Sequence, residues 1–195
     1  AIYDHGFEMD HPDLISNTFG NGFDATTGTS PSQVRGNHGT ACAGIIGAAQ
    51  NNNLGVSGVA PESDIVSISI NLQFSDTPAQ LASGFNWAWQ NGVEVISNSW
   101  GGYSPSNIIT DAIYNALNNG RNGLGTIIVF AAGNENNTNI RYPGSVIPEV
   151  LVVGAMSPCG ERKNPSSCDG ESSWGGCYGD QLDIVAPGVK IPTTD

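Results

Sequence analysis

The stretch that decides the fold is "TIIVFAAGN", residues 126–134, in which an apolar run leads directly into glycine and asparagine. A continuous β-branched and aromatic run of this kind predicts a strand of a parallel sheet that is buried on both faces. A second run, "VLVVG" over residues 150–154, has the same character. Paired strands of this type are typical of α/β proteins, in which helices cover a parallel sheet.

Upstream of this stretch, short apolar runs alternate with amphipathic segments. Residues 65–70 ("IVSISI") and 93–97 ("VEVIS") predict strands, whereas helical spacing of apolar residues predicts helices over 79–91 and 108–117. Asn118-Asn119-Gly120 is expected to close the second helix. Strand, helix, strand, helix, strand is the order of a parallel sheet that is covered by helices on both sides. We therefore expect a single domain over residues 1–195 with a three-layer α/β fold, mostly parallel, with helices on both faces of the sheet.

Composition excludes several classes of partner. The chain has 195 residues, of which 38% are hydrophobic, and a formal net charge of −12. This charge is spread along the sequence and would repel nucleic acid and anionic membranes. No run of 18 apolar residues occurs, so we expect no membrane span.

Two residues at predicted strand and helix ends have the chemistry of a proton relay. Asp4 follows an apolar strand end, and His38 begins a helix rich in small residues, "GNHGTACAGIIGA". An aspartate that holds a histidine in one tautomer lets the imidazole accept a proton from a nucleophile. Each residue alone also has a simpler explanation, since an Asp before Gly is often a turn and a histidine at this position is often a capped core residue.

The end of the deciding stretch adds a third group. Asn134 presents a neutral amide donor, which suits stabilisation of a developing oxyanion. The segments around it and after the strand at 93–97 would form two extended walls between which a peptide lies as an added strand. The expected wall residues are Ser99, Trp100, Gly101, Ala131, Ala132 and Gly133, with Glu135 at the rim.

In combination, these segments resemble the subtilisin-like serine endopeptidases (subtilases, peptidase family S8). The matching segments, in the family's order, are "AIYDHGFEMDHPDL", "NHGTACAGIIGA", "NNLGVSGVAP", "VEVISNSWGG", "IIVFAAGNE", "YPGS" and "LDIVAPGV". The resemblance is nearest to the kexin-like branch and its bacterial relatives. It implies a sheet of about seven strands, with Asp4 and His38 as two members of a Ser-His-Asp triad and Asn134 as the oxyanion donor. The intact protein is then expected to be a serine endopeptidase that cleaves extended peptides or proteins.

The nucleophile of the triad is the main departure from the family. In the family, the nucleophilic serine lies in a Gly-Thr-Ser-x-Ala segment beyond "APGV". The present sequence stops at Asp195, shortly after "APGV". Gly28-Thr29-Ser30 repeats the first three residues of this motif, but it lies in a Thr- and Ser-rich loop ahead of His38. We therefore interpret it as a loop and not as the nucleophile segment. We therefore expect a catalytic domain truncated at both ends, inactive by itself, whose missing C-terminal segment carries the serine. The alternative is an inactive subtilase relative or fragment that binds extended peptide.

The segments expected to determine substrate specificity, "WGGYSPS" and "GNENNTNIRYPG", also differ from those of kexin. They supply Glu135 but not the paired aspartates that recognise a basic residue, so dibasic cleavage is disfavoured. A pocket between the two walls is expected to take a medium or large apolar residue, with Glu135 tolerating a basic one.

The resemblance further implies a structural calcium site, since "HPDL" and "QNNNLGV" match the family's calcium loop. Calcium binds six to eight oxygens. The implied ligands are the Asp13 and Asn52 side chains and the carbonyls of Gln50, Leu54 and Val56. A plain Asn-rich turn is the alternative.

Four cysteines bear on compartment and reactivity. Cys159 and Cys168 are the favoured disulfide, ahead of pairings with Cys177, while the lack of a C-x-x-C pair or a nearby histidine argues against zinc at this cluster. A disulfide indicates an oxidising compartment, so we expect a secreted, extracellular or periplasmic protein. Cys42 lies one helical turn after His38 and is expected to be a buried thiol beneath the imidazole. Cys177 is expected to be free.

Overall fold

The computed structural model describes residues 1–73 and 75–195. The chain divides into two compact units. The first comprises Ala1–Ser97, Ser106–Thr126 and Pro192–Asp195, and the second comprises Asn98–Pro105 and Ile127–Ile191. The expectation of one domain over the whole chain stays a prediction.

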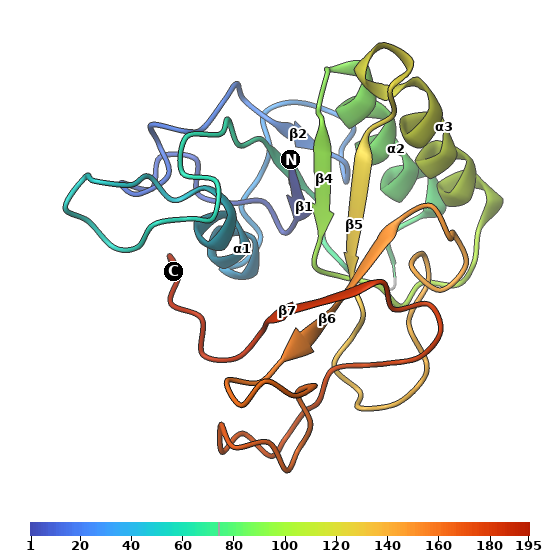
Figure 1. Ribbon diagram of the computed structural model, residues 1–195. Coiled ribbons are helices and arrows are strands. Elements are labelled where there is room, and N and C mark those ends of the chain that lie inside the picture. The colour runs from blue at the N-terminus through green and yellow to red at the C-terminus, as the bar shows by residue number, and fades with distance from the viewer. Residues whose placement is uncertain (74) are drawn as a thin grey trace. The chain divides into compact units, whose positions relative to one another are not determined.

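The first unit is built on a parallel sheet (Figure 1). Its strands are β1 (Ile2–Asp4), β2 (Phe23–Asp24), β3 (Ser67–Ser69) and β4 (Val95–Asn98), in the order β2-β3-β1-β4. All described pairings between these strands are parallel. Their carboxyl ends therefore lie along one edge of the sheet, which is where open parallel sheets carry their chemistry.

Helices cover both faces of this sheet, as the alternation of side chains along β1 demonstrates. Tyr3 points to one face, where its hydroxyl donates to the carbonyl of Leu81 at 2.9 Å and its ring meets Phe85 edge-on. Both partners belong to α2 (Pro78–Gln90). Ile2 and Asp4 point to the opposite face, where Ile2 joins an apolar cluster with Ala43 of α1 (His38–Gly47).

Local sequence signals explain where α2 and α3 (Asn107–Gly123) begin and end. Thr77 and Gln80 form a reciprocal capping box at the start of α2. The α3 helix was expected to close at Gly120, and its backbone leaves helical geometry there, through Asn122. A Cβ at Gly120 would lie 2.0 Å from the hydroxyl of Thr126, so glycine lets the chain turn back into the next strand. The two helices lie side by side in Figure 1.

The second unit carries three parallel strands, in the order β5-β6-β7. They are β5 (Ile127–Ala131), β6 (Leu151–Met156) and β7 (Ile184–Pro187). The expectation that the deciding stretch is buried on both faces is wrong for β5. Ile128 and Phe130 are buried, but Ile127 on the alternate face is 47% exposed. The reason is that the described part of this unit contains no helix to cover that face.

The α/β fold expected from the sequence is confirmed. Among the described residues there are seven strands, four in the first unit and three in the second. The bounds of β3, β4, β5 and β6 differ from the predicted ones by at most a few residues, whereas no range was predicted for β2 or β7. Within the described residues, no helix is both long and apolar enough to cross a membrane.

Candidate active site

The aspartate of the expected relay is fixed by β1. Ile2 and Tyr3 are buried, and Asp4 at the end of the strand is also fully buried. Two residues on, Gly6 adopts a φ of +80°, and a Cβ there would lie 2.1 Å from the carbonyl oxygen of Gln33. Only glycine fits this turn, which ends the strand sharply and leaves the Asp4 carboxylate at the strand terminus.

The histidine is brought to Asp4 by the small residues of α1. A Cβ at Gly39 would lie 2.1 Å from the carbonyl oxygen of Gly6, and one at Gly47 would lie 2.6 Å from Ile65. The helix can therefore pack directly against the chain that leaves β1. His38 is its first residue, preceded by Asn37 as N-cap. The sequence expectation that His38 begins a small-residue helix beside Asp4 is confirmed.

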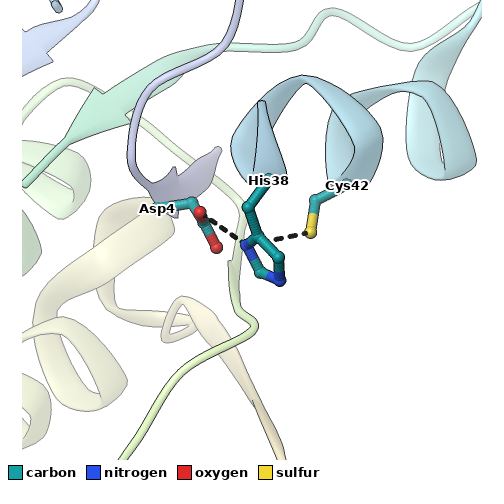
Figure 2. Close-up of side chains that lie close together, drawn as sticks. All are labelled: Asp4, His38 and Cys42. Atoms are coloured by element: carbon teal, nitrogen blue, oxygen red, sulfur yellow. Dashed lines mark hydrogen bonds and ion pairs between the residues drawn. The ribbon is translucent and has the colours of Figure 1, made fainter. Parts of the chain in front are cut away.

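The two side chains form a close pair, shown in Figure 2. His38 Nδ1 lies 2.8 Å from Asp4 Oδ1, which also accepts the backbone N–H of His5 at 2.8 Å. Asp4 Oδ2 has no hydrogen-bond partner among the described residues. The His38 side chain is 54% exposed, so the outer edge of the imidazole is open to solvent. The pair thus joins a buried carboxylate to an accessible base.

Hydrogen bonding to Asp4 raises the pKa of His38 to about 10. The nearby Cys42 also raises this pKa, whereas partial burial of the imidazole lowers it. The imidazolium is the form that gains from a buried carboxylate beside Nδ1. Asp4 therefore both orients the ring and strengthens its basicity.

The Cys42 thiol is closer to solvent than expected. Its sulfur lies 3.9 Å from His38 Nδ1, on the same helix face one turn later (Figure 2). The residue is half-buried rather than buried, so the expectation of a buried thiol is wrong. The reason is that α1 turns this part of its face toward the exposed imidazole, and only one side of Cys42 packs on the apolar cluster of the first unit.

The residues expected to bind substrate lie in the second unit. Asn134 is exposed after β5, and its backbone is held by Gly175, whose N–H donates to the Asn134 carbonyl at 3.3 Å. Gly133 has a φ of +111°, and a Cβ there would lie 2.7 Å from Glu135 Oε2, so the chain requires glycine. Trp100 is buried and packs edge-on against Phe130, so its indole is part of the apolar packing of this unit. The remaining wall residues are Ser99, Gly101, Ala131 and Ala132.

Glu135 was expected at the rim of a pocket, and the structure gives its carboxylate three partners. Oε1 pairs with Arg141 at 2.6 Å, while Oε2 accepts the backbone N–H of Asn134 at 3.1 Å and the thiol of Cys177 at 3.3 Å. The sequence analysis missed Arg141, because a partner six residues away across a loop leaves no periodic signal. The negative charge of Glu135 is therefore compensated within its own unit.

Among the expected calcium ligands, Asp13 is almost fully buried and contacts Asn52 and Val56. Its carboxylate accepts hydrogen bonds from Asn52 Nδ2 at 2.7 Å and from the Val56 N–H at 2.8 Å. Asn52 Oδ1 in turn accepts the Leu54 N–H at 3.0 Å. In the part of the chain that the structure describes, the carbonyl oxygens of Gln50, Leu54 and Val56 accept no hydrogen bond.

The cysteine-rich segment confirms the favoured disulfide, Cys159–Cys168, and leaves Cys177 free and buried. The same segment contains an ion pair that the sequence analysis missed. Lys163 Nζ lies 2.9 Å from Asp169 Oδ1, and both side chains are fully buried. Nothing in the local pattern distinguishes this lysine from an exposed one.

The loop serine set aside in the sequence analysis has a structural role. Ser30 Oγ donates to the carbonyl of Gly22 at 2.7 Å and precedes a cis peptide bond to Pro31.

A buried aspartate at a strand end, paired with a half-exposed histidine at a helix start, has the geometry of the Asp–His part of a Ser-His-Asp triad. The chain belongs to the Subtilase family (Peptidase_S8), whose match covers residues 1–195.

Curated relatives support this assignment. The chain is 33% identical to a subtilisin of Bacillus pumilus over 199 residues, covering 100% of this chain and 66% of that protein. It is also 33% identical to thermitase of Thermoactinomyces vulgaris over 195 residues, covering 100% of this chain and 64% of the relative.

Solved structures agree. A cold-adapted subtilisin-like serine proteinase superposes with a TM-score of 0.75 at 28% identity, covering 98% of this chain and 63% of the other. A protease of Pseudoalteromonas arctica gives a TM-score of 0.77 at 27% identity, over 96% and 61%. The chain thus spans about two thirds or less of the length of these relatives.

Proposed function

We propose that the protein is a serine endopeptidase that hydrolyses peptide bonds with a Ser-His-Asp triad. The observation that carries this proposal is the contact of 2.8 Å between His38 Nδ1 and the buried Asp4 carboxylate, with the outer edge of the imidazole in solvent. Membership of the subtilase family supports it.

In the proposed reaction, Asp4 holds the His38 ring through Nδ1, so that Nε2 takes the proton of a serine hydroxyl and later gives it to the leaving amine. The nucleophilic serine would be supplied by a segment that is not among these 195 residues. Asn134 would donate its side-chain amide to the oxyanion. The exposure of Asn134 at the end of β5 is consistent with that role.

The raised pKa of His38 determines the pH dependence of this chemistry. Only the neutral imidazole accepts a proton, so activity is lost as pH falls through the pKa of His38. Because Asp4 raises this pKa, the acid limb of the pH profile should lie above pH 6.5, toward alkaline pH.

The proposal is tested on the full-length protein with a fluorophosphonate probe and a peptide substrate. Stoichiometric serine labelling is expected, together with hydrolysis that is lost in His38→Ala. His5→Gln is the matched control, because His5 contacts Asp4 through its backbone N–H, which the substitution retains. If the full-length protein neither reacts with the probe nor hydrolyses any peptide, it is an inactive relative and the proposal fails.

For substrate preference, we propose an extended peptide between the segments of Ser99–Gly101 and Ala131–Gly133, with a medium or large apolar residue before the scissile bond. The pairing of Glu135 with Arg141 supports an apolar preference, since it compensates the one acidic group expected at the rim. A peptide library in which only arginine is accepted at that position would refute this preference.

We also propose structural calcium at the Asp13 loop. Three carbonyl oxygens that accept no hydrogen bond from the described residues, one buried carboxylate and one amide oxygen match the oxygen ligands that calcium takes. Each side-chain oxygen retains a lone pair beyond the bond that it accepts. Calcium at roughly 100 times its Kd would stabilise the fold by about 2.7 kcal/mol. A chelator should therefore lower the melting temperature of the protein but not that of Asp13→Asn, and an equal response of both would exclude calcium at this loop.

Finally, we propose that the protein is secreted or periplasmic. The Cys159–Cys168 disulfide supports this location, because such bonds persist in oxidising compartments.

A further inference from the structure

Three potential metal ligands converge where β1 meets α1. Asp4, His38 and Cys42 each offer one ligand atom, and these atoms lie within 4.8 Å of one another. Figure 2 shows the imidazole between the carboxylate and the sulfur. Within the described residues, no other group of three or more such side chains meets this distance.

One of these ligands is incompletely satisfied. Asp4 is fully buried, and its Oδ2 atom accepts no hydrogen bond from any described residue. A buried carboxylate oxygen without a partner carries a desolvation cost that a ligand can remove. Asp24, at the end of β2 in the same sheet, has no such atom, because hydrogen bonds reach both of its oxygens.

We propose that Asp4, His38 and Cys42 form a binding site for a divalent, thiophilic cation of the zinc class. Carboxylate, imidazole and thiolate are the ligand types that zinc takes, and the ion prefers four ligands in a tetrahedral arrangement. Tetrahedral zinc places its nitrogen and sulfur ligands about 3.5 Å apart, from Zn–N of about 2.0 Å and Zn–S of about 2.3 Å. The separation of His38 Nδ1 from Cys42 Sγ is 3.9 Å, which a small side-chain adjustment closes.

The charges of the site also balance. Binding releases the thiol proton of Cys42 and the Nδ1 proton of His38 to solvent, because both ligands must be deprotonated. One carboxylate and one thiolate then neutralise the 2+ charge of the ion. The half-exposed imidazole leaves a path for the cation and a position for water as fourth ligand.

This site differs from the Asp13 loop in the ion that it selects. Calcium prefers oxygen ligands, whereas thiolate and imidazole favour zinc, cadmium and cobalt. The two sites can therefore be titrated separately in one protein. In the proposed peptidase, a cation on Nδ1 replaces the hydrogen bond that joins His38 to Asp4, so zinc would inhibit reversibly.

Cadmium is the probe of choice, since it gives an ultraviolet charge-transfer band only when it binds thiolate. The protein, with the Cys159–Cys168 disulfide intact and its two free thiols unoxidised, is saturated with calcium and titrated with cadmium alone, and Cys42→Ala and Cys42→Ser are titrated in parallel. Cys177→Ala is the matched control, because it removes the other free thiol, which is buried in the second unit.

The expected result is one cadmium per chain, with a band that Cys177→Ala retains, that both Cys42 variants lose and that zinc displaces. The absence of a band in the wild-type protein overturns the proposal. So does a band that survives in the Cys42 variants or disappears in Cys177→Ala. Circular dichroism of each variant establishes that it is folded. This readout needs no peptidase activity, so its outcome is independent of the proposed function.

Discussion

Two aspartates end strands of the same sheet and are equally buried, yet they have very different surroundings. Asp24 at the end of β2 accepts hydrogen bonds from the Thr26 N–H, from the hydroxyls of Thr27 and Ser69, and from Arg35 at 2.8 Å. From the described residues, Asp4 at the end of β1 accepts only two, both on Oδ1, from the His5 N–H and from His38.

The difference lies in the partners. Arg35 is permanently charged and only 18% exposed, so its pair with Asp24 is a fixed link between segments. The imidazole of His38 is titratable, with a pKa raised to about 10, and its side chain is 54% exposed. Placement at a strand end therefore does not by itself make a carboxylate reactive. A titratable, accessible partner and an unfilled oxygen distinguish Asp4 from its structural neighbour.

The largest expected effect comes from neutralising each aspartate in the full-length protein. Asp4→Asn should lower kcat by about 10⁴-fold, because the amide holds the wrong tautomer of the histidine. Asp24→Asn should leave kcat nearly unchanged in protein that is folded, since Asp24 contacts no proposed catalytic group. Steady-state kinetics on one peptide checks both variants. Equal losses of kcat in the two folded variants would remove the distinction between the aspartates.

Sequence patterns predicted the helices and most of the strands, because these elements depend on short-range signals. The apolar stretch of β5, the helix start at His38 and the glycine at residue 120 each act within a few residues. The pairing of Asp4 with His38 joins residues 34 positions apart and was expected from the resemblance to the subtilases.

What the sequence could not predict depends on contacts between distant segments. The exposure of Ile127 and of Cys42 reflects which faces are left uncovered, and periodicity does not encode that. The burial of Lys163 depends on a loop that folds around its ammonium group, with the Asn164 and Glu171 carbonyls as further acceptors. Each of these features is decided by tertiary packing.

Removal of the Arg35 guanidinium should cost more unfolding free energy than removal of the His38 imidazole. Arg35→Met leaves the Asp24 charge buried without its counter-ion, which costs about 3 kcal/mol of unfolding free energy. His38→Gln should cost less, because the lost partner is half-exposed and the His5 N–H remains on Asp4. Urea denaturation of both variants at neutral pH measures the two costs. A larger loss in His38→Gln would mean that the Asp4 pair, and not the Asp24 pair, holds the sheet edge.

The two pairs should also respond to pH in opposite directions. Since the pKa of His38 is raised to about 10, its stabilising contribution is complete below pH 6.5 and is lost as pH rises toward 10. The pKa of Asp24 is lowered, with Arg35 the first of the groups that overcome the effect of burial. Its contribution is therefore present above the ordinary value of 3.8 and is lost as pH falls below it.

Melting temperatures of wild-type protein and the two variants across pH test these windows. The difference between wild type and His38→Gln should shrink only on the alkaline side, and that between wild type and Arg35→Met only on the acid side. A constant difference for either variant would contradict the corresponding pKa shift.

The smallest expected effect concerns two adjacent threonines beside Asp24, Thr26 and Thr27. Thr27 Oγ1 donates to Asp24 Oδ2 at 2.9 Å, whereas the buried hydroxyl of Thr26 has no partner among the described residues. Thr27→Val should destabilise the protein by about 1 kcal/mol, the usual net value of one hydrogen bond. Thr26→Val should be neutral or stabilising, because it removes an unsatisfied polar group and retains the backbone N–H that reaches Asp24. Urea denaturation resolves this difference, and equal costs would show that the hydroxyls around Asp24 do not hold its charge.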